Sequence, residues 1–227
     1  MDTSVRGPRP HSLSPRALAI VGWCAFLIAG TIFLVVAWNV VDRTALVVID
    51  AKLATWLHAH GSPGLTRFFL GVTHVNSIAG VSLLAFLFAL VLARMREWYW
   101  VLTLVSALTG GLALNVLLKL AYQRARPVFD KPLVELATYS FPSGHTAGAV
   151  LFYGVLAAFL VSRFYDRRKR AACVVAAVIA VVLVAFSRMY LGAHYLSDVL
   201  AAACSSTAWL VLCLSVVHHL VRRRMSG

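Results

Sequence analysis

Ionisable and small polar side chains gather in three short segments in the C-terminal half of the chain. They are, in chain order, Lys119 and Arg126; Ser143, Gly144 and His145; and Arg188, His194 and Asp198. Each segment borders a long apolar run, and an ionisable group placed in or against a bilayer costs several kcal/mol or more. We therefore treat these residues as candidates for function.

The residue types suit the binding of an anion. Lys119, Arg126 and Arg188 supply three cations, and Pro127 keeps Arg126 out of helical geometry so that it can reach into the membrane interface. Gly144 allows a ligand to approach the backbone closely, and the free N–H groups of the helix expected after it suit an oxyanion. The three segments thus predict an oxyanion site.

The histidines add acid–base chemistry. His194 and Asp198 are four residues apart at the start of the last predicted helix, so they share a face, and the carboxylate can orient the imidazole and favour its charged state. Phosphoryl transfer needs cations for the equatorial oxygens, an in-line nucleophile and a proton donor for the leaving oxygen. One histidine can attack while the other protonates. The residues leave open which one attacks, although the pairing with Asp198 favours His194.

Metal and disulfide sites are not expected. A dinuclear metal phosphatase needs several carboxylate or histidine ligands, and this face of the protein has too few acids, so we expect neither a metal nor another cofactor. The four cysteines, Cys24, Cys173, Cys204 and Cys213, lie in apolar stretches without a CxxC pair, which indicates packing.

The composition is that of a membrane protein. Of the 227 residues, 61% are hydrophobic and 13% are charged, and the mean hydropathy is +0.83. Soluble domains have about 45–50% apolar and about 25% charged residues, so a water-soluble globule is excluded, as is a disordered or collagen-like chain. We expect the net charge of +13 to serve membrane topology and contact with anionic headgroups, without a nucleic-acid partner.

Charge-free runs predict the elements that hold the site, because a spanning helix needs about 20 such residues. Six runs qualify: Ala17–Val41, Phe68–Ala93, Trp98–Leu118, Leu136–Ser162, Ala171–Ser187 and Val199–Val221. We expect the second to enter the membrane near Ile78 and the fourth near His145, and we expect Ala45–His60 to form a helix in the outer interface. The predicted fold class is all-α, a polytopic bundle of six transmembrane helices.

The distribution of Lys and Arg predicts the orientation of this bundle. The N-terminus, the second and fourth loops and the C-terminal tail together carry 13 of the 21 Lys and Arg residues, and the other face carries 8. Positive residues favour the cytoplasmic side, so we expect both termini in the cytoplasm and the site at the exterior face of the cell membrane. The expected organisation is a disordered basic arm over 1–16, a single membrane domain over 17–221 and a basic cytoplasmic tail over 222–227.

Taken together, the three segments resemble the signature of a known family. Lys119-x6-Arg126-Pro127, Pro142-Ser143-Gly144-His145 and Ser187-Arg188-x5-His194-x3-Asp198 match, at every motif position, the type 2 phosphatidic acid phosphatase family. The resemblance implies a six-helix membrane phosphatase that works without metal through a phosphohistidine. It also implies roles by position: His194 as nucleophile, Asp198 as its orienting partner, His145 as the acid for the leaving group, and Lys119, Arg126, Ser143, Gly144 and Arg188 as phosphate-binding residues.

The expected partner is a lipid phosphate in the membrane, whose terminal phosphate is hydrolysed. The motifs contact only the phosphate, so they do not specify which lipid carries it. Family base rates favour undecaprenyl pyrophosphate, with phosphatidylglycerol phosphate or phosphatidic acid as alternatives. A non-hydrolytic anion or lipid transporter is a more distant alternative, because the charges lie at one face and not near the midplane. The oligomeric state is not determined.

Polar residues outside the motifs have less specific expectations. We expect Arg124 to contact a headgroup or a loop without a catalytic role. Asn115 lies one turn below Lys119 and is a candidate to steady it. His74 and Asn76 are expected to form hydrogen bonds between helices.

Overall fold

The computed structural model describes residues 15–130, 132–134 and 138–225. Within these ranges the chain forms eight α-helices and no β-strand, which confirms the all-α prediction. The helices are α1 (Pro15–Val41), α2 (Ala45–Ala59), α3 (Pro63–Val75), α4 (Ile78–Arg94), α5 (Trp98–Tyr122), α6 (Gly144–Arg163), α7 (Arg167–Tyr190) and α8 (Leu196–Met225).

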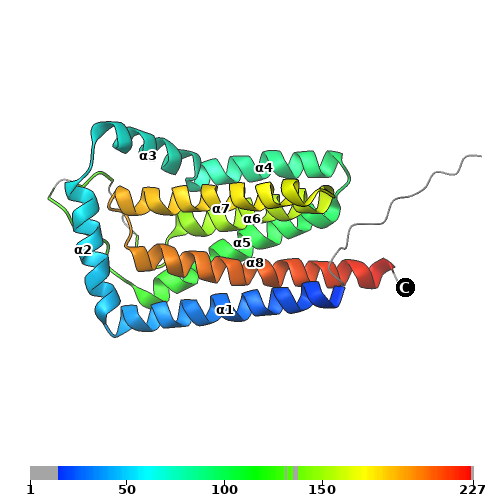
Figure 1. Ribbon diagram of the computed structural model, residues 1–227, viewed down its shortest axis with the longest axis horizontal. Helices are drawn as coiled ribbons and strands as arrows, with labels where there is room; N and C mark the ends of the chain where they lie inside the picture. Colours follow the sequence, from blue (N-terminus) through cyan, green and yellow to red (C-terminus); the bar gives the residue numbers. More distant parts are fainter. Residues whose placement is uncertain (1–14, 131, 135–137, 226–227) are drawn as a thin grey trace, which may run out of the picture.

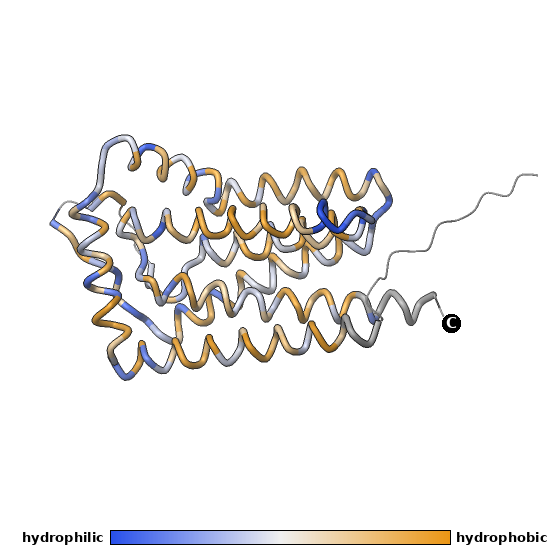
Figure 2. Tube along the Cα trace, in the orientation of Figure 1, coloured by the Kyte–Doolittle hydropathy of each residue, from blue (hydrophilic) through white to orange (hydrophobic). Residues whose placement is uncertain are grey.

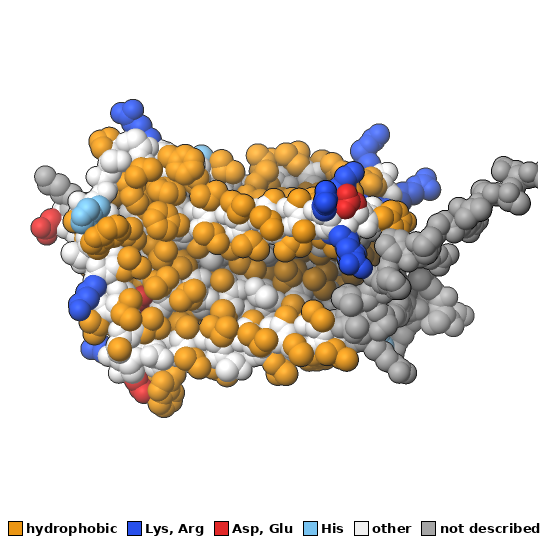
Figure 3. All heavy atoms as spheres, viewed as in Figure 1, with side chains coloured by type: hydrophobic (Ala, Val, Ile, Leu, Met, Phe, Trp, Pro, Cys, Tyr) orange, Lys and Arg blue, Asp and Glu red, His pale blue; other side chains and the backbone are white. Residues whose placement is uncertain are grey.

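Most of the helices run side by side along one axis (Figure 1). Five of them, α1, α5, α6, α7 and α8, are long and apolar enough to cross a membrane, and α3 and α4 pass the same test together as a pair bent by 51°. Apolar residues follow the lengths of these helices (Figure 2), and apolar side chains cover the side of the bundle between charged ends (Figure 3). The structure therefore has five candidate spans, or six if the bent pair is one.

The run predicted as one span over Phe68–Ala93 consists of two helices. α3 already begins at Pro63, and α4 begins after Ser77, whose hydroxyl accepts a hydrogen bond from the N–H of Gly80 at 3.2 Å. A serine cap of this kind satisfies an otherwise free amide at a helix start. The break therefore lies at Ile78, the residue near which we expected the chain to enter the membrane, and the residues before it form a separate helix bent by 51° from α4.

Two other boundaries differ from the predicted runs. α8 begins at Leu196 and not at Val199, and it continues to Met225, so residues 222–225 belong to the last helix and not to a separate tail. α1 begins at Pro15, two residues before the predicted run. Residues 1–14, most of the predicted basic arm, lie outside the described residues.

α2 lies across one end of the bundle, and the start of α1 and the end of α8 lie at the opposite end (Figure 1). The bounds of α2 confirm the helix predicted over Ala45–His60. Val48, Ile49 and Trp56 are each more than half exposed, whereas Asp50 is 1% exposed. One face of α2 thus offers apolar side chains to its surroundings, and the other directs a carboxylate into the protein.

The close approach of α5 and α8 depends on a small residue. A Cβ atom on Gly110 would lie 2.2 Å from Cζ2 of the Trp209 ring. The indole N–H donates a hydrogen bond to the backbone oxygen of Ser106 at 3.3 Å, which holds the ring in that place. Small residues allow helices to pack this closely in membranes.

We predict that Gly110→Ala destabilises the bundle, because the added methyl group overlaps the Trp209 ring and overpacking costs about 1–3 kcal/mol. Gly30→Ala in α1 is the matched control, since no atom lies within 4 Å of its Cβ position and alanine favours a helix. Thermal unfolding in detergent should give a lower Tm for Gly110→Ala alone. Equal Tm values for the two variants would contradict this role of Gly110.

Candidate active site

Three parts of the chain meet at the end of the bundle where α2 lies: the exit from α5, the start of α6 and the turn between α7 and α8. The exit from α5 carries Lys119 in its last turn, and Gln123 ends the helix in a left-handed conformation with a φ of 45°. The segment that follows is linked to the loop before α6, because the N–H of Ser140 donates to the backbone oxygen of Arg124 at 2.8 Å.

The turn between α7 and α8 is short and tightly closed. The N–H groups of Ala193 and His194 both donate to the backbone oxygen of Arg188, at 3.0 and 3.2 Å. Gly192 has a φ of +68°, a conformation that glycine adopts without a steric penalty. A Cβ atom there would also lie 2.7 Å from the Phe129 ring. The turn therefore holds Arg188 and His194 in one fixed arrangement.

The start of α6 is tied to the start of α8. Ser143 caps α6, because its hydroxyl accepts a hydrogen bond from the N–H of Thr146 at 3.4 Å. Its own N–H donates to the backbone oxygen of Asp198 at 3.1 Å. Ser143 is 0% exposed, and Gly144 and His145 follow it in the first turn of α6.

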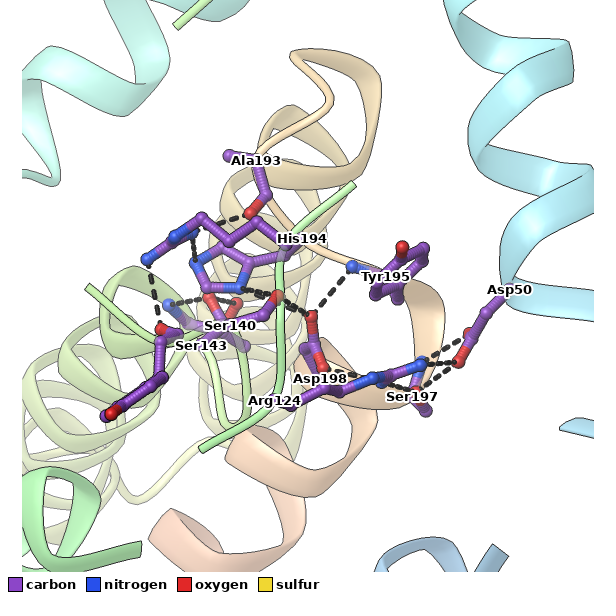
Figure 4. Close-up of polar contacts among 12 residues, drawn as sticks. Asp50, Arg124, Ser140, Ser143, Ala193, His194, Tyr195, Ser197 and Asp198 are labelled. Atoms are coloured by element: carbon purple, nitrogen blue, oxygen red, sulfur yellow. Dashed lines mark hydrogen bonds and ion pairs between the residues drawn. The ribbon is translucent and has the colours of Figure 1, made fainter. Parts of the chain in front are cut away.

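His194 lies between a carboxylate and a guanidinium (Figure 4). Its Nδ1 is 3.4 Å from Oδ2 of Asp198, and its Nε2 is 3.1 Å from Nη1 of Arg126. A proton on Nδ1 satisfies Asp198 and leaves the lone pair of Nε2 directed at the cation. This is the arrangement that a nucleophilic histidine needs when an anion binds on the Arg126 side.

Burial keeps His194 neutral. Desolvation lowers the pKa of His194 to about 4; the hydrogen bond and charge of Asp198 act in the opposite direction, and Arg126 and Arg188 lower the pKa further. The sequence suggested that Asp198 would favour the charged imidazole, but the buried position outweighs that effect. At neutral pH the imidazole is therefore free to act as a nucleophile.

Lys119 and Arg126 are anchored by backbone oxygens. Nζ of Lys119 donates to the backbone oxygen of Tyr139 at 2.6 Å. Arg126 donates to the backbone oxygens of Thr138 and Ala193, each at 2.6 Å. Neutral acceptors fix the position of these two cations without cancelling their charge.

Arg188 is the third predicted cation, and it is 2% exposed. It donates a hydrogen bond to the hydroxyl of Thr73 on α3, while its Nε is buried and has no partner among the described residues. The three cations thus lie around His194 with donor capacity left for an anion.

His145 links this polar site to the side of the bundle. It borders, with Gly144, a cavity of about 360 Å³ between α4, α5 and α6. The rest of the lining is mostly apolar and includes Ile78, Val81, Phe86, Leu104 and Leu108. His145 also lies close enough to Arg188 and His194 to interact with their charges. The predicted motif residues are therefore brought together at one end of the bundle.

The side chain of Arg124 contacts α2 and α8 and not a loop, which differs from the loop contact that we considered. It is 11% exposed; Nη1 donates to Oδ1 of Asp198 at 2.7 Å, and Nη2 donates to Oδ2 of Asp50 at 2.8 Å. The side chain is drawn inward because two buried carboxylates offer it stronger partners than the interface does. Arg124 is thus bonded directly to the partner of His194.

The residues that contact this site and went unnoticed in the sequence include Asp50, Ser140 and Ser197. Asp50 had a usable signal, because a carboxylate in an otherwise apolar interfacial helix is costly unless it has a partner. The two serines had none, since serine is common at helix starts and in loops.

Other polar residues follow the predictions in part. Asn76 forms the expected bond between helices, accepting from the Tyr153 hydroxyl at 3.1 Å, whereas His74 is exposed. Asn115 is 5% exposed, and among the described residues its Nδ2 has no hydrogen-bond partner, so the structure shows no bond from it to Lys119.

Residues 15–130, 132–134 and 138–225 contain no group of three or more His, Cys, Asp or Glu side chains that could hold a metal ion. Chemistry without a metal stays a prediction.

Comparison with known proteins places the chain in a family. A sequence model of the PAP2 superfamily matches residues 98–222. The chain is 38% identical over 141 residues to phosphatidylglycerophosphatase B of Bacillus subtilis (strain 168), covering 61% of this chain and 68% of that protein.

Solved structures agree with this assignment. The crystal structure of a transmembrane PAP2 type phosphatidylglycerolphosphate phosphatase from Bacillus subtilis matches with a TM-score of 0.76 and 27% identity, over 87% of this chain and 96% of that one. LpxE from Aquifex aeolicus matches in fold, with a TM-score of 0.59 and 23% identity over 74% of this chain and 95% of that one. The matched residues 98–222 contain all three motifs. The chain therefore belongs to the PAP2 superfamily, and it is a membrane lipid phosphate phosphatase, a hydrolase.

Proposed function

We propose that this enzyme hydrolyses the terminal phosphate of phosphatidylglycerophosphate through a phosphohistidine on His194. The observation that carries the mechanism is the position of Nε2 of His194, 3.1 Å from Arg126, on an imidazole that is neutral at neutral pH. A phosphate bound by the cations lies within reach of that nitrogen.

The reaction has two balanced steps. In the first, Nε2 of His194 attacks phosphorus, and the P–O bond to the glycerol oxygen breaks as His145 gives that oxygen a proton. In the second, His145 takes a proton from water, the water oxygen attacks phosphorus, and the P–N bond breaks to release phosphate. Asp198 accepts the hydrogen bond from Nδ1 and stabilises the imidazole charge during both steps. The lipid product is phosphatidylglycerol.

The cations stabilise the charge that spreads over the equatorial oxygens. Lys119 and Arg126 are not neutralised by a carboxylate, because they form hydrogen bonds mainly to backbone oxygens. The unpartnered Nε of Arg188 offers a donor inside the site. Ser143 and Gly144 add the N-terminus of α6, where amide N–H groups favour an anion.

The choice of lipid rests on the relatives and on the cavity. The name of the Bacillus subtilis relative and the name given to the Bacillus subtilis crystal structure both specify phosphatidylglycerophosphate, which supports that alternative better than undecaprenyl pyrophosphate. The cavity between α4, α5 and α6 is mostly apolar and ends at His145, the proposed acid. A substrate whose headgroup lies at His145 can place an acyl chain in this cavity.

The site faces the exterior of the cell membrane in this proposal. The excess of Lys and Arg at the end that holds the start of α1 and the end of α8 supports a cytoplasmic position for that end. The site lies at the opposite end, beside α2.

We predict that His194→Ala lowers phosphate release by about 10³-fold or more and abolishes an acid-labile phosphoenzyme, because the nucleophile is lost. Wild type should keep its activity in EDTA. His219→Ala, an exposed histidine of α8 outside the site, is the matched control and should behave as wild type. Release by His194→Ala at the wild-type rate would refute the phosphohistidine mechanism.

We predict that kcat/KM is higher for phosphatidylglycerophosphate than for undecaprenyl pyrophosphate or phosphatidic acid in the same detergent micelles. Phosphate release from the three lipids measures the ranking, and a higher value for undecaprenyl pyrophosphate would reverse the substrate assignment.

We predict that filling the cavity impairs binding of the lipid, and two neighbouring residues of α4 provide the test and its control. Ser82 lines it, whereas Leu83 is 59% exposed on the outside of the bundle. Ser82→Trp should raise KM for the long-chain lipid but not for p-nitrophenyl phosphate, and Leu83→Trp should change neither.

We predict that a membrane-impermeant maleimide labels Val128→Cys in intact spheroplasts but labels Tyr165→Cys only after lysis. These side chains are 91% and 86% exposed and lie in the segments that follow α5 and α6 at opposite ends of the bundle. The unsubstituted chain measures the background from its own cysteines. The reverse pattern would place the site in the cytoplasm.

A further inference from the structure

The interfacial helix α2 contributes a buried carboxylate to the end of the bundle that holds the site. Asp50 is 1% exposed and accepts hydrogen bonds from three donors. They are Nη2 of Arg124 at 2.8 Å, the N–H of Ser197 at 3.0 Å and the hydroxyl of Ser197. Asp50 lies outside residues 98–222, the part of the chain that matches the family. Its contacts nevertheless lead directly into the catalytic site.

Arg124 connects Asp50 to Asp198. One terminal nitrogen of its guanidinium bonds Asp50, and the other bonds Oδ1 of Asp198 and the hydroxyl of Ser197 at 2.6 Å. The guanidinium also lies over the ring of Tyr195, 4.3 Å from its centroid. Figure 4 shows Asp50, Arg124 and Asp198 in series, with His194 beyond Asp198. The planar guanidinium of Arg124 has little freedom to rotate, because it is bonded to the carboxylates of both Asp50 and Asp198.

The second oxygen of Asp198 is held from the other side. Oδ2 accepts hydrogen bonds from the hydroxyl of Ser140 and from the N–H of Tyr195 at 2.8 Å, and it faces Nδ1 of His194. Arg124 supplies the charged bond to Oδ1, so its loss would free one side of the carboxylate. The orientation of the His194 ring depends on where that carboxylate points.

We propose that Asp50 is a positioning residue for the nucleophile: acting through Arg124, it fixes the carboxylate of Asp198 and thereby the ring of His194. This inference rests on the proposed function for the role of His194. It adds a residue from the interfacial helix to the machinery, so the seating of α2 on the bundle sets the geometry of phosphoryl transfer.

The series of charges predicts the direction in which each substitution changes the pKa of His194. Asp50→Asn keeps the shape and removes a negative charge, which disfavours the imidazolium and lowers the pKa of His194. Arg124→Gln removes a positive charge, which raises the pKa of His194. Other charged or titratable groups surround the His194–Asp198 pair and are unchanged in both variants. They are Lys119 on α5, Arg126 after α5, His145 on α6, Arg188 on α7 and Tyr195 before α8.

The first test measures the His194 pKa directly and needs no substrate. NMR titration of ¹⁵N-histidine-labelled protein in detergent, with His194→Ala to assign the signal, should show shifts in opposite directions for the two variants. Arg163→Gln is the matched control, because it breaks the Arg163–Glu97 ion pair at the other end of the bundle and should leave the His194 signal in place. An unmoved titration in both Asp50→Asn and Arg124→Gln overturns the proposal.

The second test is kinetic. Asp50→Asn and Arg124→Gln should each lower kcat by about 10- to 100-fold, as expected for a misplaced reacting group. KM should stay within about twofold, because the phosphate-binding cations are untouched. The double variant should be no slower than Arg124→Gln alone, since Asp50 acts through Arg124. Arg124→Lys, which keeps the charge but not the fork, replaces Arg124→Gln if that variant does not fold, and it should also lower kcat.

The outcomes separate this inference from the proposed function. The inference alone would be overturned if Asp50→Asn and the Arg124 variants fold and keep the wild-type kcat, while wild type is active and His194→Ala is inactive. Wild type that releases no phosphate from any lipid would overturn the proposed function, and the NMR titration would still decide the role of Asp50.

Discussion

The buried carboxylate of Asp198 is the constraint on which this end of the bundle depends. An isolated carboxylate without water is prohibitively costly, and Asp198 is 0% exposed. It is satisfied by Arg124 after α5, Ser140 before α6 and the N–H of Tyr195 at the start of α8. Removing one member of such a buried pair typically costs about 3–5 kcal/mol, a large share of the about 5–15 kcal/mol that stabilises a typical protein. The bonds that orient His194 therefore also hold the loops together.

The basic residues of the site differ in how their charges are compensated. Arg124 lies between two carboxylates, so its charge serves structure and cannot attract a ligand strongly. Lys119 and Arg126 bond backbone oxygens, and Arg188 bonds a threonine hydroxyl, so their charges stay uncompensated. That difference produces a positive centre suited to a phosphate next to a neutral imidazole. Burial supports both properties, because it strengthens the field of the cations and keeps the His194 imidazole neutral.

The break between α3 and α4 connects the lipid-facing side with this centre. α4 lines the cavity that ends at His145, and Thr73 of α3 bonds Arg188 from the other side of the break. Asn76, at the break itself, borders the cavity and accepts a bond from Tyr153 on α6. One bent pair of helices thus holds a cation of the site and borders the cavity in which we propose that a lipid chain lies.

The sequence alone determined the helical class, the apolar runs and the motif residues, because hydropathy and residue spacing are local properties of the chain. It also predicted α2, from a short apolar stripe between loops. Only the tertiary structure decided that Arg124 turns inward to Asp50 and that Thr73 holds Arg188. Asp50 and Arg124 are separated by 74 positions in the sequence, and Thr73 and Arg188 by 115, so no local pattern could reveal these contacts. It also decided that His194 is neutral: Asp198 at four residues' distance favours the charged ring, and only the burial created by packing several helices around it reverses that preference.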